Sequence, residues 1–337
     1  MSAILDLLRH EHAVLWAEAQ AKISDVRWKS VPARVDPHHM TVARSRLLAR
    51  NRIAIRETRT KGGYNIGVLH LRDTAGIATA VDTAAARKRA LMATLHSWLN
   101  PRSGYPLGFV GAAGERVTHS SLLEAAPYGL RLERPDAGEV RCLLGEEVEG
   151  GPFDNAAWVQ VTNSIGAPVE VVLCPIEVKN IRHWIYPSAS ELHQLLHKAA
   201  LLQRRHEDLH VCPVLVTRKK SYSANAMSRD LGFRILDVNR QFVLPVAEVD
   251  RDALSRIRTE LGFSDLVAHD GADPALVRAL QQLSSTALTN AMHWRRFGPE
   301  LVDHFETLRE NLTPSQRHAA MEELHDAVRE LGGDARW

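Results

Sequence analysis

The sequence of 337 residues lacks the features that mark membrane-embedded and secreted proteins. No uninterrupted apolar run approaches the roughly 20 residues that are needed to cross a bilayer. The N-terminal stretch MSAILDLLRHEHAV carries Asp6, His10 and Glu11 where a signal peptide would need an apolar core. These absences predict a soluble, cytoplasmic protein.

Cysteine is also scarce. Cys142, Cys174 and Cys212 are widely spaced, and the sequence has no CxxC pair. An odd number of dispersed thiols within apolar runs argues against a disulfide framework and predicts three reduced thiols in the core. Internal repeats and low-complexity tracts are absent as well, while 45% of the residues are hydrophobic. A chain of this length and composition can form two or three domains with cores of their own.

Charge is nearly balanced over the whole chain but is concentrated in one segment. Between Arg27 and Lys61 there are ten Arg or Lys residues against Asp36 and Glu57, a local net charge of +8. Because the whole chain has a net charge of +2, the remainder carries −6. Such a segment predicts a surface that binds a polyanion, and the alternative is a solvated face without a ligand.

Periodicity and turn residues divide the chain into three regions, 1–105, 106–248 and 249–337. The first is predicted to be α+β, with an amphipathic N-terminal helix, a β-hairpin formed by RIAIRETRT and YNIGVLHL, and a long helix that Asp82 caps. The last is predicted to be helical, because DPALVRALQQL and TPSQRHAAMEELHDAVREL each begin with a capping residue followed by proline. The C-terminal region is expected to serve as a scaffold or an oligomer contact.

The middle region is predicted to follow the order helix, three strands, helix, strand. The first helix is expected at 114–126 and the three strands at 139–146, 156–163 and 168–179. A second helix follows, with Ser188 and Glu191 as a capping box and an apolar stripe at helical spacing. The run VCPVLVTR is apolar throughout, as expected for a strand that is covered on both faces.

Two charged residues stand out in the strand PVEVVLCPIEVK. Glu177 and Lys179 project from one face of the strand, since successive side chains alternate between faces. Asp154 lies in a turn before the preceding strand, and an antiparallel pairing would bring its carboxylate beside that of Glu177. A divalent cation would relieve the repulsion between two such carboxylates. The alternative is a solvated salt bridge at the end of a sheet.

These residues and their order resemble the PD-(D/E)XK nuclease superfamily, which has the restriction-endonuclease-like fold. The E-x-K motif of that family falls on Glu177, Val178 and Lys179, and its upstream aspartate falls on Asp154. The usual Pro-Asp pair is here Pro152-Phe153-Asp154, and Pro175 lies within the E-x-K strand. The resemblance implies an α/β fold with a mixed sheet flanked by helices over about residues 110 to 240.

The resemblance also implies a chemistry. Asp154 and Glu177 would hold Mg²⁺, with Mn²⁺ as a substitute, and Lys179 would assist the water that attacks the phosphodiester. Glu115 on the first core helix matches a further family glutamate, and Glu124 on the same helix competes for that role. Gln194 matches a glutamine of the second core helix, although Gln194 and Lys198 fit a solvated helix face about as well.

DNA is the expected substrate, and the function expected from the resemblance is a metal-dependent endonuclease of the restriction or defence type. The side chains expected to contact DNA are Arg52, Arg56, Arg59, Lys61, Asn180 and Arg182. Trp184 and Tyr186 could stack on a base or pack against the core. Because two sites are usually needed to cut both strands, a homodimer is also expected. The competing hypothesis is an inactive, nuclease-like module that binds DNA or assembles with a partner.

Overall fold

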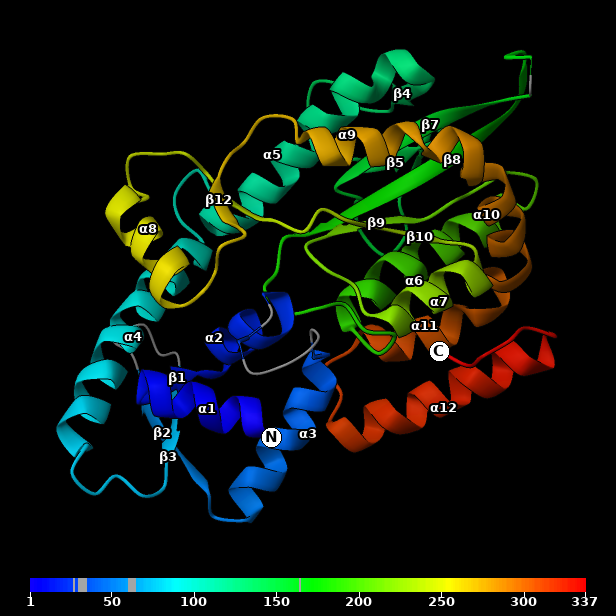
Figure 1. Ribbon diagram of the computed structural model, residues 1–337. Coiled ribbons are helices and arrows are strands. Elements are labelled where there is room, and N and C mark those ends of the chain that lie inside the picture. Colours follow the sequence, from blue (N-terminus) through cyan, green and yellow to red (C-terminus); the bar gives the residue numbers. More distant parts are fainter. Residues whose placement is uncertain (27, 30–34, 60–64, 164) are drawn as a thin grey trace. The chain divides into compact units, whose positions relative to one another are not determined.

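The computed structural model describes residues 1–337 except 27, 30–34, 60–64 and 164 (Figure 1). The chain forms two compact units. Unit 1 comprises Met1–Ala112 and Val243–Ala268, and unit 2 comprises Ala113–Phe242 and His269–Trp337. Residues 249–337, expected from sequence to be one helical region, are therefore divided between the two units.

Unit 1 contains a three-stranded antiparallel sheet in the order β1-β3-β2. The predicted hairpin is present as β2 and β3, and the turn that joins them, with Lys61, Gly62 and Gly63, lies outside the described residues. The elements of this unit are α1 (Ser2–Glu11), β1 (Ala13–Leu15), α2 (Trp16–Gln20), the π-helical turn η1 (Ala21–Asp25), α3 (Pro37–Ala49), β2 (Ile53–Arg59), β3 (Asn65–Leu71), α4 (Ala78–Leu99), α8 (Arg251–Glu260) and β12 (Leu266–Ala268).

The apolar faces of these elements form one core. Ile4, Leu7 and Leu8 of α1 are buried there as their helical spacing predicts, together with Leu69 of β3. The helix α4 begins at Ala78, so the prediction that Asp82 caps it is wrong. Residues 78–81 are also helical, so the helix begins about one turn before Asp82.

Unit 2 is built around a mixed five-stranded sheet in the order β10-β9-β8-β7-β4, flanked by helices (Figure 1). The strand β7 (Asn155–Thr162) is antiparallel to both of its neighbours, β4 (Leu130–Leu132) and β8 (Pro168–Lys179). The strands β9 (Val214–Thr217) and β10 (Arg234–Asp237) run parallel to β8. The predicted α/β class with a mixed sheet is confirmed at this level.

One predicted strand is wrong. Residues 139–146 form no part of the main sheet, because they contribute the short strand β5 (Cys142–Leu143), which pairs with β6 (Glu146–Glu147) in a sheet of their own. Cys142 is exposed, which corrects the prediction that all three thiols lie in the core. The sheet position expected for 139–146 is taken by β4, whose three residues are too few to show an alternating pattern.

Helices surround this sheet and bury a large apolar core. The core joins Leu195 of α6 and Leu215 of β9 to Phe305 of α11. The helix α6 begins at Ser190 with Ala189 as its N-cap, so the predicted capping box of Ser188 and Glu191 does not form. The helical and remaining elements are α5 (Gly108–Ala125), η2 (Ala126–Tyr128), α6 (Ser190–Arg205), α7 (Tyr222–Leu231), β11 (Gln241–Val243), α9 (Pro274–Gln281), α10 (Leu283–Phe297), η3 (Pro299–Leu301), α11 (Val302–Arg309) and α12 (Pro314–Glu330).

Both predicted C-terminal helix starts are present. Asp273 caps α9 and Thr313 caps α12, and each is followed by proline in the first turn. Among the described residues, none of the helices combines the length and the apolar character that a membrane span requires.

Candidate functional site

The sheet of unit 2 brings Asp154 and Glu177 to the same end of two neighbouring strands. β7 begins at Asn155, which pairs with Ile176 in the antiparallel register, so Asp154 lies opposite the segment of β8 that carries Glu177. The carboxylate of Asp154 accepts a hydrogen bond of 2.7 Å from the backbone N–H of Val178. Strand register therefore places the two predicted metal ligands together.

Glu177 is 3% exposed and is contacted by two lysines. Lys179 Nζ donates to its Oε2 at 3.1 Å, as expected for neighbours on one face of a strand. Lys198 Nζ donates to the other oxygen, Oε1. Both oxygens of this buried carboxylate therefore carry an ammonium partner.

Lys198 was not predicted to be part of the site. It lies on α6, is 7% exposed, and also donates to the carbonyl oxygen of Pro152 at 2.6 Å. Its ammonium is 4.8 Å from the ring centroid of Phe153. Gln194, one turn earlier on α6, is exposed and is absent from the hydrogen bonds that join the described site residues. Gln194, expected from the resemblance to be a site residue, thus lies on the solvated helix face that was the alternative, whereas Lys198, for which the same alternative was given, is buried.

Glu115 on α5 joins this cluster, whereas Glu124 is exposed further along the same helix. Burial and the negative charge of Asp154 raise the pKa of Glu115 to about 7, although Lys179 opposes the shift. Close approach of α5 to the end of β8 depends on Gly114, where a Cβ atom would lie 2.5 Å from Cβ of Asn180. The absence of a side chain at Gly114 thus lets the helix bring Glu115 to the site.

The electrostatics of the cluster couple its members. Burial and the charge of Glu177 raise the pKa of Asp154 to about 6, while Lys179 and the hydrogen bond from Val178 oppose the rise. Burial would lower the pKa of Lys179, but the carboxylates of Glu177 and Asp154 outweigh this effect and raise it. Lys179 is therefore held in its charged form, and Asp154 is ionised at neutral pH against the repulsion of Glu177.

The segment that follows β8 forms hydrogen bonds with other residues of unit 2. The amide of Asn180 donates to the carbonyl oxygen of Phe242 at 2.8 Å and accepts from its N–H at 3.0 Å. Arg182 is half-buried and donates to Gln241 Oε1 at 3.5 Å. The Lys219 ammonium lies 5.4 Å from the Trp184 ring. Asn180 is therefore a structural tie, although it was predicted to contact DNA.

The structure also shows a charged contact that the sequence did not suggest. His183 lies 3.3 Å from the carboxylate of Glu191 in the first turn of α6. The hydrogen bond from His183 lowers the pKa of Glu191 to about 2. Glu191, expected to cap its own helix, thus holds the segment between β8 and α6.

The predicted DNA-contacting residues of unit 1 lie on and beside the edge strand β2. Arg52, Arg56 and Arg59 are exposed, and Lys61 lies outside the described residues. Arg56 forms an ion pair with Asp82 of α4. Arg44 lies 4.4 Å above the ring of Trp16, and burial lowers its pKa. Two arginines of the basic segment 27–61, Arg44 and Arg56, thus contact neighbouring side chains within unit 1.

The carboxylates fit a hard divalent cation by their donor chemistry. The part of the chain that the structure describes contains no group of three or more His, Cys, Asp or Glu side chains that could hold a metal ion. Asp154 and Glu177 would then be the donor set, which suits Mg²⁺ because this ion usually takes one or two protein carboxylates together with water and substrate phosphates. Burial is the main cause of the raised pKa of Asp154, and the repulsion from Glu177, which adds to it, is what such a cation would relieve.

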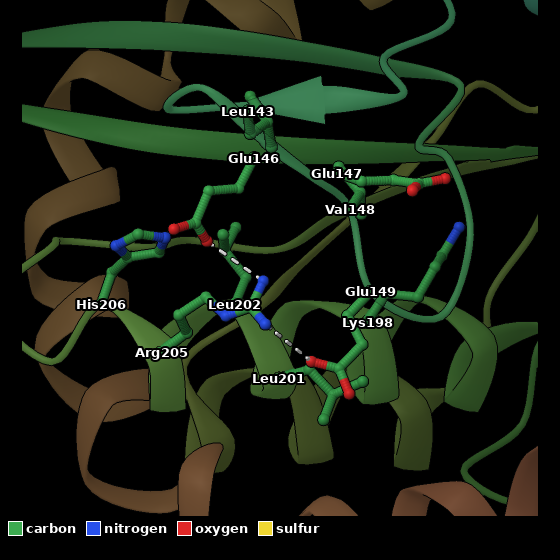
Figure 2. Close-up of a pocket in the computed structure, with 10 residues that line it drawn as sticks. All are labelled: Leu143, Glu146, Glu147, Val148, Glu149, Lys198, Leu201, Leu202, Arg205 and His206. Atoms are coloured by element: carbon green, nitrogen blue, oxygen red, sulfur yellow. Dashed lines mark ion pairs between the residues drawn. The ribbon is translucent and has the colours of Figure 1, made fainter.

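A pocket is lined in part by Lys198 and Arg205 of α6 (Figure 2). Its floor is formed by Leu143, Val148 and Leu201, and Arg205 forms ion pairs across it with Glu146 at 3.1 Å and Glu149 at 3.7 Å. In Figure 2 the ammonium of Lys198 points away from Arg205. The aliphatic stem of Lys198 lines this pocket, while its ammonium forms an ion pair with Glu177.

Comparison of the chain with protein-family models, with curated proteins and with solved structures gives no significant match.

Proposed function

We propose that unit 2 is a metal-dependent phosphodiesterase of the PD-(D/E)XK type that cleaves DNA. The main support is the placement of Asp154, Glu177 and Lys179 at one end of two antiparallel strands. The order α5, β4, β7, β8, α6, β9 also agrees with the core order of that superfamily. Both features are formed by residues that the structure describes.

In this proposal each side chain has a distinct part. Asp154 and Glu177 would hold Mg²⁺, which when bound neutralises charge on the phosphate under attack. Lys179 keeps its proton because its pKa is raised, so its ammonium can stabilise the negative charge that develops on the phosphate. Glu115, with a pKa of about 7, can accept a proton from the attacking water near neutral pH.

Unit 1 is proposed to hold the DNA backbone through its basic residues. Arg52, Arg56 and Arg59 are exposed and can approach phosphates, which attract arginine without regard to base sequence. A restriction or defence role, cytoplasmic location and a homodimer that places two sites on a duplex complete the proposal.

One observation favours a second candidate, an inactive DNA-binding module. Glu177 is already neutralised by Lys179 and Lys198, so the cluster is satisfied without a metal. Incubation of the purified protein with supercoiled plasmid and Mg²⁺, with EDTA as the control, separates the two. Nicked or linear product supports the nuclease. Retarded but intact plasmid in both Mg²⁺ and Mn²⁺ supports the binding module, and a parallel RNA substrate tests whether RNA is cleaved instead.

A further inference from the structure

Glu177 meets two ammonium groups of different origin. Lys179 is two residues away on the same strand, so its position beside Glu177 is set by β8. Lys198 comes from α6, 21 residues further along the chain, and is 9% exposed at its side chain. The second ammonium is thus supplied by a separate element.

The surroundings of Lys198 are built to hold this side chain. Its stem lines the pocket with Val148 and Leu201 (Figure 2). Its ammonium donates to the carbonyl oxygen of Pro152, two residues before Asp154. A Cβ atom at Gly150 would lie 3.1 Å from Cγ of Lys198, and Gly150 has a φ of +82°. Glycine there leaves room for the stem and provides the backbone turn around it.

We propose that Lys198 is an internal counter-cation, which competes with the divalent metal for Glu177 and sets the metal concentration that the site requires. This inference rests on the function proposed above. A carboxylate with an ammonium on each oxygen attracts a further cation less than one with a single partner. Metal binding must therefore displace the Lys198 ammonium or share Glu177 with it, and Lys198 is a positioning residue that acts through Glu177.

Lys198 is better suited than Lys179 to give way. Its other close contacts are a neutral carbonyl oxygen at 2.6 Å and an aromatic ring at 4.8 Å, and Asp154 attracts it less strongly than it attracts Lys179. Lys179 is attracted by both Glu177 and Asp154. Loss of the Lys198 charge should therefore strengthen metal binding, whereas a purely structural tie would leave it unchanged or weaken it.

The test is titration of the full-length protein with Mn²⁺, followed by electron paramagnetic resonance of the free ion. In K198M, which keeps an apolar stem in the pocket, the dissociation constant for Mn²⁺ should fall at least about tenfold. K198R keeps the charge and should stay close to wild type. R205M removes a cation from the same helix and the same pocket but not from Glu177, and it should also match wild type.

An unchanged or weaker Mn²⁺ affinity in folded K198M would overturn the inference. If K198M does not fold, K198Q carries the same expectation, because its amide can still donate to the Pro152 carbonyl oxygen. The proposed function is judged separately by plasmid cleavage with wild-type protein. If wild-type protein cleaves plasmid but K198M binds Mn²⁺ with wild-type affinity, only the counter-cation role is rejected. If K198M binds Mn²⁺ more tightly but wild-type protein does not cleave plasmid, only the nuclease function is rejected. If neither form binds Mn²⁺, both are rejected.

Discussion

The carboxylate of Asp154 and the backbone N–H of Val178 are joined by a hydrogen bond of 2.7 Å that crosses from the start of β7 to the end of β8. Because Val178 lies between Glu177 and Lys179, this bond fixes Asp154 beside both of them. The three side chains are held by strand register together with one backbone contact, which is a rigid arrangement for a site.

Replacement of Asp154 by asparagine tests the metal ligand without breaking this hydrogen bond. D154N keeps an oxygen that can accept from Val178 but loses the charge, so DNA cleavage should fall by about a thousandfold or more. The melting temperature at pH 7.5 should stay the same or rise, because the ionised Asp154 is disfavoured by burial and by Glu177. Cleavage by D154N at the rate of the exposed control D136N would contradict the assignment.

The raised pKa values predict how stability depends on pH. Glu115 and Asp154 bind protons more tightly in the folded state, with pKa values near 7 and 6 in place of 4.5 and 3.8. The folded state then retains protons that the unfolded chain releases, so the contribution of these two carboxyls to stability is largest below about pH 4 and is lost as pH rises to about 7.

Thermal melts of E115Q measured between pH 4.5 and 7.5 check this dependence. The variant should show a weaker decline than wild type, because one of the two raised carboxyls has been removed. E124Q changes an exposed glutamate of the same helix and should reproduce the wild-type curve. Equal curves for E115Q and E124Q would mean that Glu115 does not sense the cluster.

Lys179 should affect turnover more than binding. K179M removes an ammonium that acts chiefly on the charge of the transition state, so the single-turnover rate should fall about a hundredfold or more while the DNA dissociation constant changes little. K179R retains the charge and should recover part of the rate. A parallel loss of rate and DNA affinity in K179M would indicate a phosphate anchor.

Unit 1 contains a buried charge network whose disruption should be costly. Lys88 donates to Glu18 at 2.6 Å, to Glu11 at 2.9 Å and to the carbonyl oxygen of Ala13, and Lys22 contacts the same two glutamates. Because Glu18 is 0% exposed, K88M should lower the free energy of unfolding by about 3–5 kcal/mol in urea denaturation.

An adjacent arginine supplies the control for this network. R89Q changes a half-buried residue of the same helix, whose hydrogen bond to Thr58 lies at the surface, and should cost less than about 1 kcal/mol. In the double variant K88M/E18Q a charge of each sign has been removed, so it should be more stable than K88M. A small effect of K88M would mean that water reaches Glu18 in solution.

The salt dependence of DNA binding tests the basic residues of unit 1. R52Q/R56Q/R59Q should weaken binding and reduce the slope of log affinity against log salt by about 2–3, since each lost phosphate contact removes about 0.9. Cleavage at saturating DNA should persist. The control triple R251Q/R256Q/R258Q removes three exposed charges of α8 in the same unit and should leave the slope unchanged. Fluorescence anisotropy over a salt series distinguishes the two.

The sequence predicts the part of the site that depends on strand geometry. Glu177 and Lys179 share a face because side chains alternate along any strand, and the register of two long strands then brings in Asp154. The position of Lys198 beside Glu177 depends on how α6 packs against the sheet. The alternation of side chains along a strand does not determine that packing. A signal was nevertheless present, since Lys198 follows Leu195 by three residues and precedes Leu202 by four, at the edge of the apolar stripe.

The length and alternation of a strand also explain which parts of the sheet were predicted correctly. The long β8 has the predicted bounds of 168–179, and Pro175 does not interrupt its pairing with β7. The three-residue β4 shows too little alternation to be found from sequence. Residues 139–146 alternate well but contain Gly145 with a φ of +85°, which turns the chain back on itself.

The composition of unit 1 from two separate segments has a consequence for synthesis of the protein. The helix α8 packs in unit 1, and its Glu260 forms an ion pair of 2.6 Å with Arg87 of α4. A ribosome that has just added Ala112 must still make the whole of 113–242 before the second segment appears. At about 5–20 residues per second, the nascent first segment waits roughly 7–26 s before the segment that carries the buried Leu254 and Ile257 is made. During that interval unit 1 lacks one of its two segments and cannot complete its fold.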